Sequence, residues 1–219
     1  MKQTYRFLVI IFAALILQGA GHYFAHKLVA GKYFYWGWLA FRVAVPAILI
    51  ALMRISWKEM GLNLPSLDRG TKKILIFSGI ILVLLFIVMQ FMDDYLGAYK
   101  YSFMGGAGKY ARFINFSIFT LSTLTAWEFF HRSFLFKGLI FTFEHDLKID
   151  RQGAALIAAA VVAVFEVMFH FKKPMPEAAG LLIASPFFSY LVYKTGSIWP
   201  SFLIHLAIEF IFIGSLLIQ

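Results

Sequence analysis

Residues 161–171 read VVAVFEVMFHF, an almost continuous apolar run that carries one acid and one histidine, Glu166 and His170. Residues four apart lie on the same side of an α-helix, so both polar groups of this run face one direction. An ionisable side chain within hydrocarbon is costly, and it usually faces the interior of a helix bundle and serves a function. The run therefore predicts a membrane-embedded helix that presents a polar pair to its neighbours.

Two further apolar stretches repeat this arrangement. Residues 124–136, LTAWEFFHRSFLF, contain Glu128 and Arg132, and residues 201–212, SFLIHLAIEFIF, contain His205 and Glu209. The members of each pair are again one helical turn apart. Three such pairs in a chain of 219 residues predict that three helices converge on a buried reaction centre.

The composition is that of an integral membrane protein. Hydrophobic residues make up 61% of the chain and charged residues 14%, whereas soluble domains have about 45–50% and about 25%. Cysteine is absent, which excludes disulfides, thiolate nucleophiles and thiolate metal sites. The net charge of +9 comes mostly from residues between apolar segments, as in loops that flank a bilayer, so we expect no nucleic-acid partner.

Seven stretches approach the roughly 20 apolar residues that a membrane-spanning helix needs: 6–25, 35–53, 73–92, 113–140, 153–171, 177–193 and 198–217. The first continues through Tyr23 and Phe24 without a convincing cleavage site, so we expect a retained span and not a signal peptide. The fourth is polar in its second half, and we expect it to tilt or to re-enter before it ends near Lys137. The sequence thus predicts an all-α, polytopic helical membrane bundle that forms one domain over residues 1–219.

Glu128 is the strongest candidate for a catalytic residue. A buried carboxylate beside a cation such as Arg132 is suited to taking a proton from water; alternatively, the pair only neutralises two charges and fixes the helix. His131 is expected to point to a different side of the helix, as a packing or interfacial residue. Arg42, inside the second apolar stretch, either snorkels toward the interface or counters one of the acids.

The two histidines suggest a metal site. We expect the Glu166 carboxylate to accept the ring N–H of His170, which is the usual arrangement behind a histidine that binds a metal. His205 and Glu209 repeat the pair in inverted order. If the helices converge, His170, His205 and Glu209 would complete the three-ligand set of a catalytic Zn²⁺ or another divalent metal.

Three segments of the chain, WEFFHRSFLFKGL, FHFKKPMPEAAGLL and YKTGSIWPSFLIHLAIEF, occur in this order. They resemble the motifs of the CAAX-protease and bacteriocin-processing family, also called the abortive-infection family. The family's first motif is EExxxR, its second is FxxxH on a later helix, and its last is a His followed one turn on by Asn or Asp. The resemblance covers roughly residues 54–217 and includes the MGLNLP segment.

The resemblance implies that Glu128 and Arg132 match the second Glu and the Arg of the first motif, while His170 and His205 match the histidines of the other two. It implies a helical intramembrane metalloprotease fold. Better-understood members cleave C-terminal tripeptides from prenylated proteins, and some bacterial members are linked to bacteriocin self-immunity. We therefore expect a metalloendopeptidase of the bacterial cell membrane that acts on membrane-anchored or lipidated peptides, with Glu128 as the base and Arg132 or Glu166 tuning it.

Three residues depart from the family's pattern. Trp127 replaces the first Glu of the pair, Glu166 replaces the Phe of the second motif, and Glu209 replaces the final Asn or Asp. Either the catalytic base lies at Glu128 or Glu166, or the activity has decayed. An inactive member would act as a membrane scaffold or a bacteriocin-immunity protein. A transporter or proton relay could use the same residues, but the chain shows no repeated half.

Overall fold

The computed structural model describes residues 5–27, 34–65, 68–89, 108–170 and 175–211. Within these ranges the secondary structure is helical, with no strand. The predicted all-α class is therefore confirmed.

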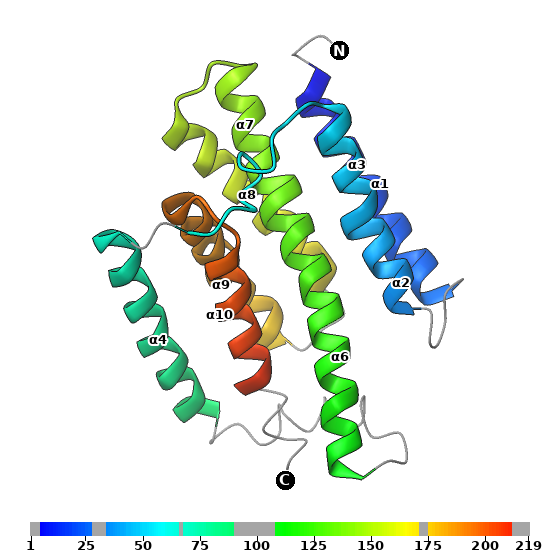
Figure 1. Cartoon of the computed structure of the whole chain (residues 1–219), viewed down its shortest axis with the longest axis vertical. Helices are drawn as coiled ribbons and strands as arrows, with labels where there is room; N and C mark the ends of the chain where they lie inside the picture. Colours follow the sequence, from blue (N-terminus) through cyan, green and yellow to red (C-terminus); the bar gives the residue numbers. More distant parts are fainter. Residues whose placement is uncertain (1–4, 28–33, 66–67, 90–107, 171–174, 212–219) are drawn as a thin grey trace. The chain divides into compact units, whose positions relative to one another are not determined.

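The helices form seven continuous stretches in the described part of the chain (Figure 1). They are α1 (Tyr5–Lys27); α2 (Phe34–Leu39), η2 (Ala40–Ala44) and α3 (Val45–Leu52) in succession; α4 (Arg69–Met89); α6 (Lys109–Glu128), η4 (Phe129–Lys137) and α7 (Gly138–His145) in succession; α8 (Arg151–His170); α9 (Met175–Thr195); and α10 (Trp199–Glu209). Each of the seven apolar stretches expected from the sequence overlaps one of these. The fourth does not end near Lys137 but continues as helix to His145.

One described helix, Arg151–His170, is both long and apolar enough to cross a membrane. Tyr5–Ala20 and Trp36–Leu52 are shorter apolar segments. A polytopic bundle with seven spans stays a prediction.

The chain divides into two compact units, and two of the three boundaries between them fall inside α6 and α10. The first unit comprises residues 1–66 and 126–201, and the second comprises residues 67–125 and 202–219. The single domain over residues 1–219 stays a prediction.

The first unit is built around η4. Every residue from Phe129 to Phe136 is buried, and the aromatic and aliphatic side chains among them join the apolar core together with residues of α1, α3 and α8. Helix α8 contributes small buried residues, Ala154 and Ala158, which allow close helix packing. This helix packs against α7, α9 and η4, so Glu166 on α8 is brought to the polar residues of η4.

Two segments of the first unit are π-helical, and each carries a fully buried arginine. Arg42 lies in η2 and Arg132 lies in η4. A π-helix closes i→i+5 hydrogen bonds, is rare, and often marks a functional site. Because it winds more widely than an α-helix, residues four apart no longer align as the sequence analysis assumed.

The connection after α3 attaches to the start of α10. Ile198 N donates to Gly61 O at 2.9 Å, and Ser197 Oγ donates to Asn63 O at 2.6 Å. Gly61 has a φ of +75°, and a Cβ placed there would lie 3.4 Å from Gly196 O. Ser133 Oγ donates to Met60 O at 2.9 Å, so the same connection also holds η4.

The second unit contains α4, the first part of α6 and the last part of α10. Asp68 Oδ1 accepts the Thr71 N–H at 2.7 Å, which is the contact of a residue that caps the start of a helix. The Phe210 ring packs edge-on against Phe113 and Phe116, with ring centroids 5.9 and 5.3 Å apart. This unit also carries His205 and Glu209.

Candidate active site

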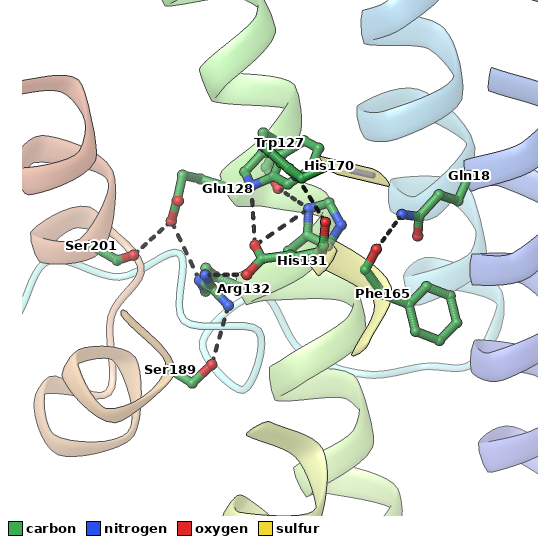
Figure 2. Close-up of polar contacts among 10 residues, drawn as sticks. Gln18, Trp127, Glu128, His131, Arg132, Phe165, His170, Ser189 and Ser201 are labelled. Atoms are coloured by element: carbon green, nitrogen blue, oxygen red, sulfur yellow. Dashed lines mark hydrogen bonds and ion pairs between the residues drawn. The ribbon is translucent and has the colours of Figure 1, made fainter. Parts of the chain in front are cut away.

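Figure 2 shows a buried polar cluster of the first unit that includes Trp127, His131 and Arg132. The Glu166 carboxylate is at the centre of this cluster. Its Oε2 accepts a hydrogen bond from Arg132 Nη2 at 2.9 Å, and its Oε1 accepts one from Trp127 Nε1 at 3.0 Å. The side chain is fully buried. A buried carboxylate is tolerated when it is paired with a cation and hydrogen-bonded, and Glu166 meets both conditions.

Arg132 joins Glu166 to two other helices. Its Nη1 donates to Ser189 Oγ on α9 at 3.1 Å, and its Nε lies 3.9 Å from Glu128 Oε2. The predicted ion pair between Glu128 and Arg132 is therefore present. It is longer than the 2.9 Å contact between Arg132 and Glu166, because the π-helical winding begins directly after Glu128.

Glu128 and Trp127 are neighbours in the sequence, but they lie at opposite ends of the series of polar contacts that runs through Arg132 and Glu166. Glu128 is the last residue of α6, its side chain is buried, and its Oε2 accepts the Ser201 hydroxyl at 2.7 Å. Figure 2 shows a continuous run of polar contacts from Ser201 through Glu128 and Arg132 to the carboxylate that Trp127 contacts. The structure thus brings together the three residues predicted to be catalytic, namely Glu128, Arg132 and Glu166.

His131 belongs to the cluster, and the expectation that it points elsewhere was wrong. The side chain is fully buried, and its Nδ1 lies 3.0 Å from Trp127 O and 3.9 Å from Glu166 Oε1. A carbonyl oxygen can only accept, so Nδ1 carries the hydrogen in this contact. The α-helical spacing used for the sequence analysis fails here because His131 lies within the π-helical segment.

His170 bonds to the main chain of Glu166. Its Nδ1 lies 2.8 Å from Glu166 O, whereas the Glu166 carboxylate is turned toward Arg132 and Trp127. The expected contact between the ring N–H and the Glu166 carboxylate stays a prediction. The observed contact still places the hydrogen on Nδ1, and in the neutral ring Nε2 then carries the lone pair that a metal would need.

Trp127 contacts both imidazoles as well as Glu166. Its ring centroid lies 4.1 Å from that of His131 and 5.3 Å from that of His170. The sequence singled out Trp127 only as a departure from a family motif. Nothing in the pattern indicated that its indole N–H would bind the carboxylate introduced at position 166.

Arg42 is enclosed by aromatic rings. Its guanidinium carbon lies 4.1 Å from the centroid of Trp38 and 4.5 Å from that of Phe169, and the side chain is fully buried. The alternative in which Arg42 snorkels to an interface was therefore wrong. The Glu166 charge attracts the guanidinium, so the other alternative, a counter-charge for an acid, is supported.

The predicted metal ligands fall in different units. His170 is half-buried in the first unit, whereas His205 and Glu209 are half-buried on α10 in the second. Across the residues that the structure describes, no three His, Asp or Glu side chains form a group that could hold a metal ion. The set of His170, His205 and Glu209 stays a prediction.

The buried polar cluster thus lies on apolar helices of an all-α protein. A family model described as "Type II CAAX prenyl endopeptidase Rce1-like" matches residues 110–211, a range that includes all three predicted catalytic residues. This match supports membership of the CAAX protease family, which is the family indicated by the motifs and whose members are membrane proteins. The comparisons with curated proteins and with solved structures gave no match.

Proposed function

We propose that this protein is an intramembrane endopeptidase that hydrolyses a peptide bond in a membrane-anchored or lipidated substrate, in the manner of a CAAX prenyl protease. Family membership supports a protease that acts on membrane-associated peptides. The bacterial cell membrane is the location we propose for it. The buried cluster around Glu166 supplies the acid and base groups that such a reaction needs.

The different surroundings of the two glutamates carry this proposal. Both Glu166 oxygens accept strong hydrogen bonds, from Trp127 and from Arg132, so this carboxylate is held in place. Glu128 accepts the Ser201 hydroxyl at 2.7 Å, and its Oε2 lies 3.9 Å from Arg132 Nε. Glu128 matches the second Glu of the family's first motif, so we assign it as the general base, and Glu166 acts as a positioning residue through Arg132.

The proposed reaction begins when Glu128 takes a proton from water. The water oxygen forms a bond to the carbonyl carbon of the substrate, and the π-electron pair of the C=O bond moves onto oxygen. When that pair returns, the C–N bond breaks, and the protonated Glu128 gives its proton to the leaving nitrogen. A positioned acid–base group that transfers the proton contributes about 10²–10⁴-fold to such a rate.

A divalent metal, in the first instance Zn²⁺, remains part of the proposal. When bound, it would polarise a carbonyl oxygen and acidify water. The fixed ring of His170, with Nδ1 bonded to Glu166 O, supports that histidine as one ligand. His205 and Glu209 are the further ligands that we propose.

Cleavage by the full-length protein in phosphatidylcholine vesicles tests the function. We expect wild type to cleave lipidated fluorogenic peptides, and Glu128→Gln to lower kcat by about 10²–10⁴-fold. Glu144→Gln is the matched control, because Glu144 lies outside the cluster and pairs with the exposed Arg151 at 4.0 Å. Wild-type activity in Glu128→Gln would contradict the assigned base.

The second candidate is a catalytically inactive membrane scaffold or bacteriocin-immunity protein. The observation that favours it is that both Glu166 oxygens accept hydrogen bonds, from Trp127 and from Arg132. A purely structural cluster would show the same contacts. In a cellular assay of immunity, the scaffold predicts that Glu128→Gln and His170→Ala protect as well as wild type at equal expression. The peptidase predicts that Glu128→Gln removes the phenotype.

A further inference from the structure

Arg42 is buried without a hydrogen bond. Its side chain is 0% exposed, and Nε, Nη1 and Nη2 all lack a hydrogen-bond partner among the residues that the structure describes. A guanidinium presents five N–H donors in one plane. Buried polar groups are nearly always bonded, and an exception calls for an explanation such as a bound ligand.

The acids of the cluster do not satisfy this arginine. Arg132 lies 2.9 Å from Glu166 and 3.9 Å from Glu128, whereas within the described ranges Arg42 has no ion pair within 4 Å. Both Glu166 oxygens already accept hydrogen bonds, so Glu166 attracts Arg42 through charge alone. The cluster therefore contains two arginines and two glutamates, and Arg132 makes both of the ion-pair contacts described above.

Aromatic rings hold the Arg42 guanidinium in position. Trp38 and Phe169 are nearest, at 4.1 and 4.5 Å, and Trp127 and Phe130 follow at 5.1 and 5.4 Å. Ring faces attract a cation, but they do not replace oxygen acceptors for its N–H groups. The rings therefore stabilise the charge and leave the donors for an incoming group.

We infer that Arg42 binds a carboxylate group of the substrate. This inference rests on the proposed peptidase function and names the part of the peptide that the site recognises. The guanidinium fork matches the two oxygens of a carboxylate, with two parallel hydrogen bonds. The Trp127 ring lies near the Arg42 guanidinium, and its indole N–H donates to the Glu166 carboxylate. Trp127 therefore links the proposed site for the substrate carboxylate to the acid cluster.

A peptide has two sources of carboxylate, its free C-terminus and the side chains of Asp or Glu. Three fluorogenic peptides of one sequence distinguish them: a free acid, a C-terminal amide, and an amide that carries one added Glu. Cleavage of each peptide by the full-length protein in phosphatidylcholine vesicles is measured in turn. A carboxylate-bearing peptide should have a KM at least about tenfold lower than the plain amide, the size expected for hydrogen bonds between charged groups.

Variants of Arg42 test whether its guanidinium causes the lower KM of carboxylate-bearing peptides. Arg42→Gln should raise the KM of the preferred peptide to that of the plain amide, with little change in kcat. Arg42→Lys, which keeps the charge but not the fork, should retain only part of the preference and serves if the Gln variant does not fold. Arg69→Gln is the control, because Arg69 is exposed at the start of α4.

Two results would overturn the inference. One is an equal KM for all three peptides in wild type, and the other is an unchanged preference in a folded Arg42→Gln protein. If wild type cleaves no peptide, the proposed function fails, and fluorescence anisotropy of the same labelled peptides then tests the inference by itself. Tighter binding of a carboxylate-bearing peptide that is lost in Arg42→Gln would support it, and equal binding of all three would reject it.

Discussion

At the scale of single residues, the cluster depends on two substitutions that lie far apart in the sequence. Trp127 and Glu166 are 39 positions apart, and each departs from the motif that its segment resembles. Their side chains nevertheless bind each other. A tryptophan in place of a glutamate, taken alone, suggested a decayed site; paired with Glu166, it keeps a carboxylate beside the first motif. Sequence spacing could not reveal this, because the contact depends on how α8 packs against η4.

Trp127→Phe tests the indole hydrogen bond while it retains an aromatic ring. It leaves a buried carboxylate oxygen without its N–H donor, so we expect the free energy of unfolding to fall by about 1–3 kcal/mol. Denaturant unfolding in detergent, followed by circular dichroism, measures the change. Trp57→Phe is the control, because Trp57 is 49% exposed, and an equal effect of both variants would contradict the assigned role.

Arg132→Met tests the buried ion pair. It removes the cation that contacts both Glu128 and Glu166, so the free energy of unfolding should fall by about 3–5 kcal/mol. Adding Glu166→Leu removes one uncompensated charge and should recover part of that loss. Arg151→Met, at a residue whose side chain is 63% exposed in a 4.0 Å pair with Glu144, should cost less than about 1 kcal/mol. If the double variant is no more stable than Arg132→Met, the two side chains are not energetically coupled.

At the scale of helices and connections, the apolar pattern predicted the number and approximate positions of the helices, because continuous apolar runs of that length form helices in a membrane protein. It did not predict the π-helical winding of η4. That winding follows from packing and leaves no mark in residue spacing. As a result, α-helical spacing correctly predicted that Arg132 lies beside Glu128, but it also predicted that His131 points away from the cluster, which it does not.

Gly61→Ala tests the connection that holds η4 and the start of α10. Alanine at a φ of +75° is strained by about 1–2 kcal/mol, and its Cβ would lie in van der Waals contact with Gly196 O, at 3.4 Å. We therefore expect a lower melting temperature together with reduced activity, because Ser133 of η4 bonds to the neighbouring Met60 O. Gly79→Ala is the matched control: it lies within α4 with nothing within 4 Å of an added Cβ, and helix propensity should stabilise it by up to about 1 kcal/mol.

At the scale of the whole molecule, the metal prediction concerns residues of both units. If His170, His205 and Glu209 hold Zn²⁺, the purified protein should contain about one zinc per molecule by elemental analysis, and chelation should abolish cleavage. His205→Ala should lose the metal, whereas His145→Ala, at an exposed histidine, should keep it. A protein without metal that cleaves at the full rate in the presence of a chelator would contradict the prediction.

The packing of Trp127 has a practical consequence for following the reaction. Its indole touches the carboxylate, both imidazoles and the guanidinium of Arg42, so its emission spectrum depends on the charge and hydration of all these groups. The protein has five tryptophans, and replacing the other four with phenylalanine would leave a single tryptophan, at the centre of the cluster, whose emission can be excited selectively over that of tyrosine. Light emitted from that one ring would then signal the arrival of a peptide before any bond is broken.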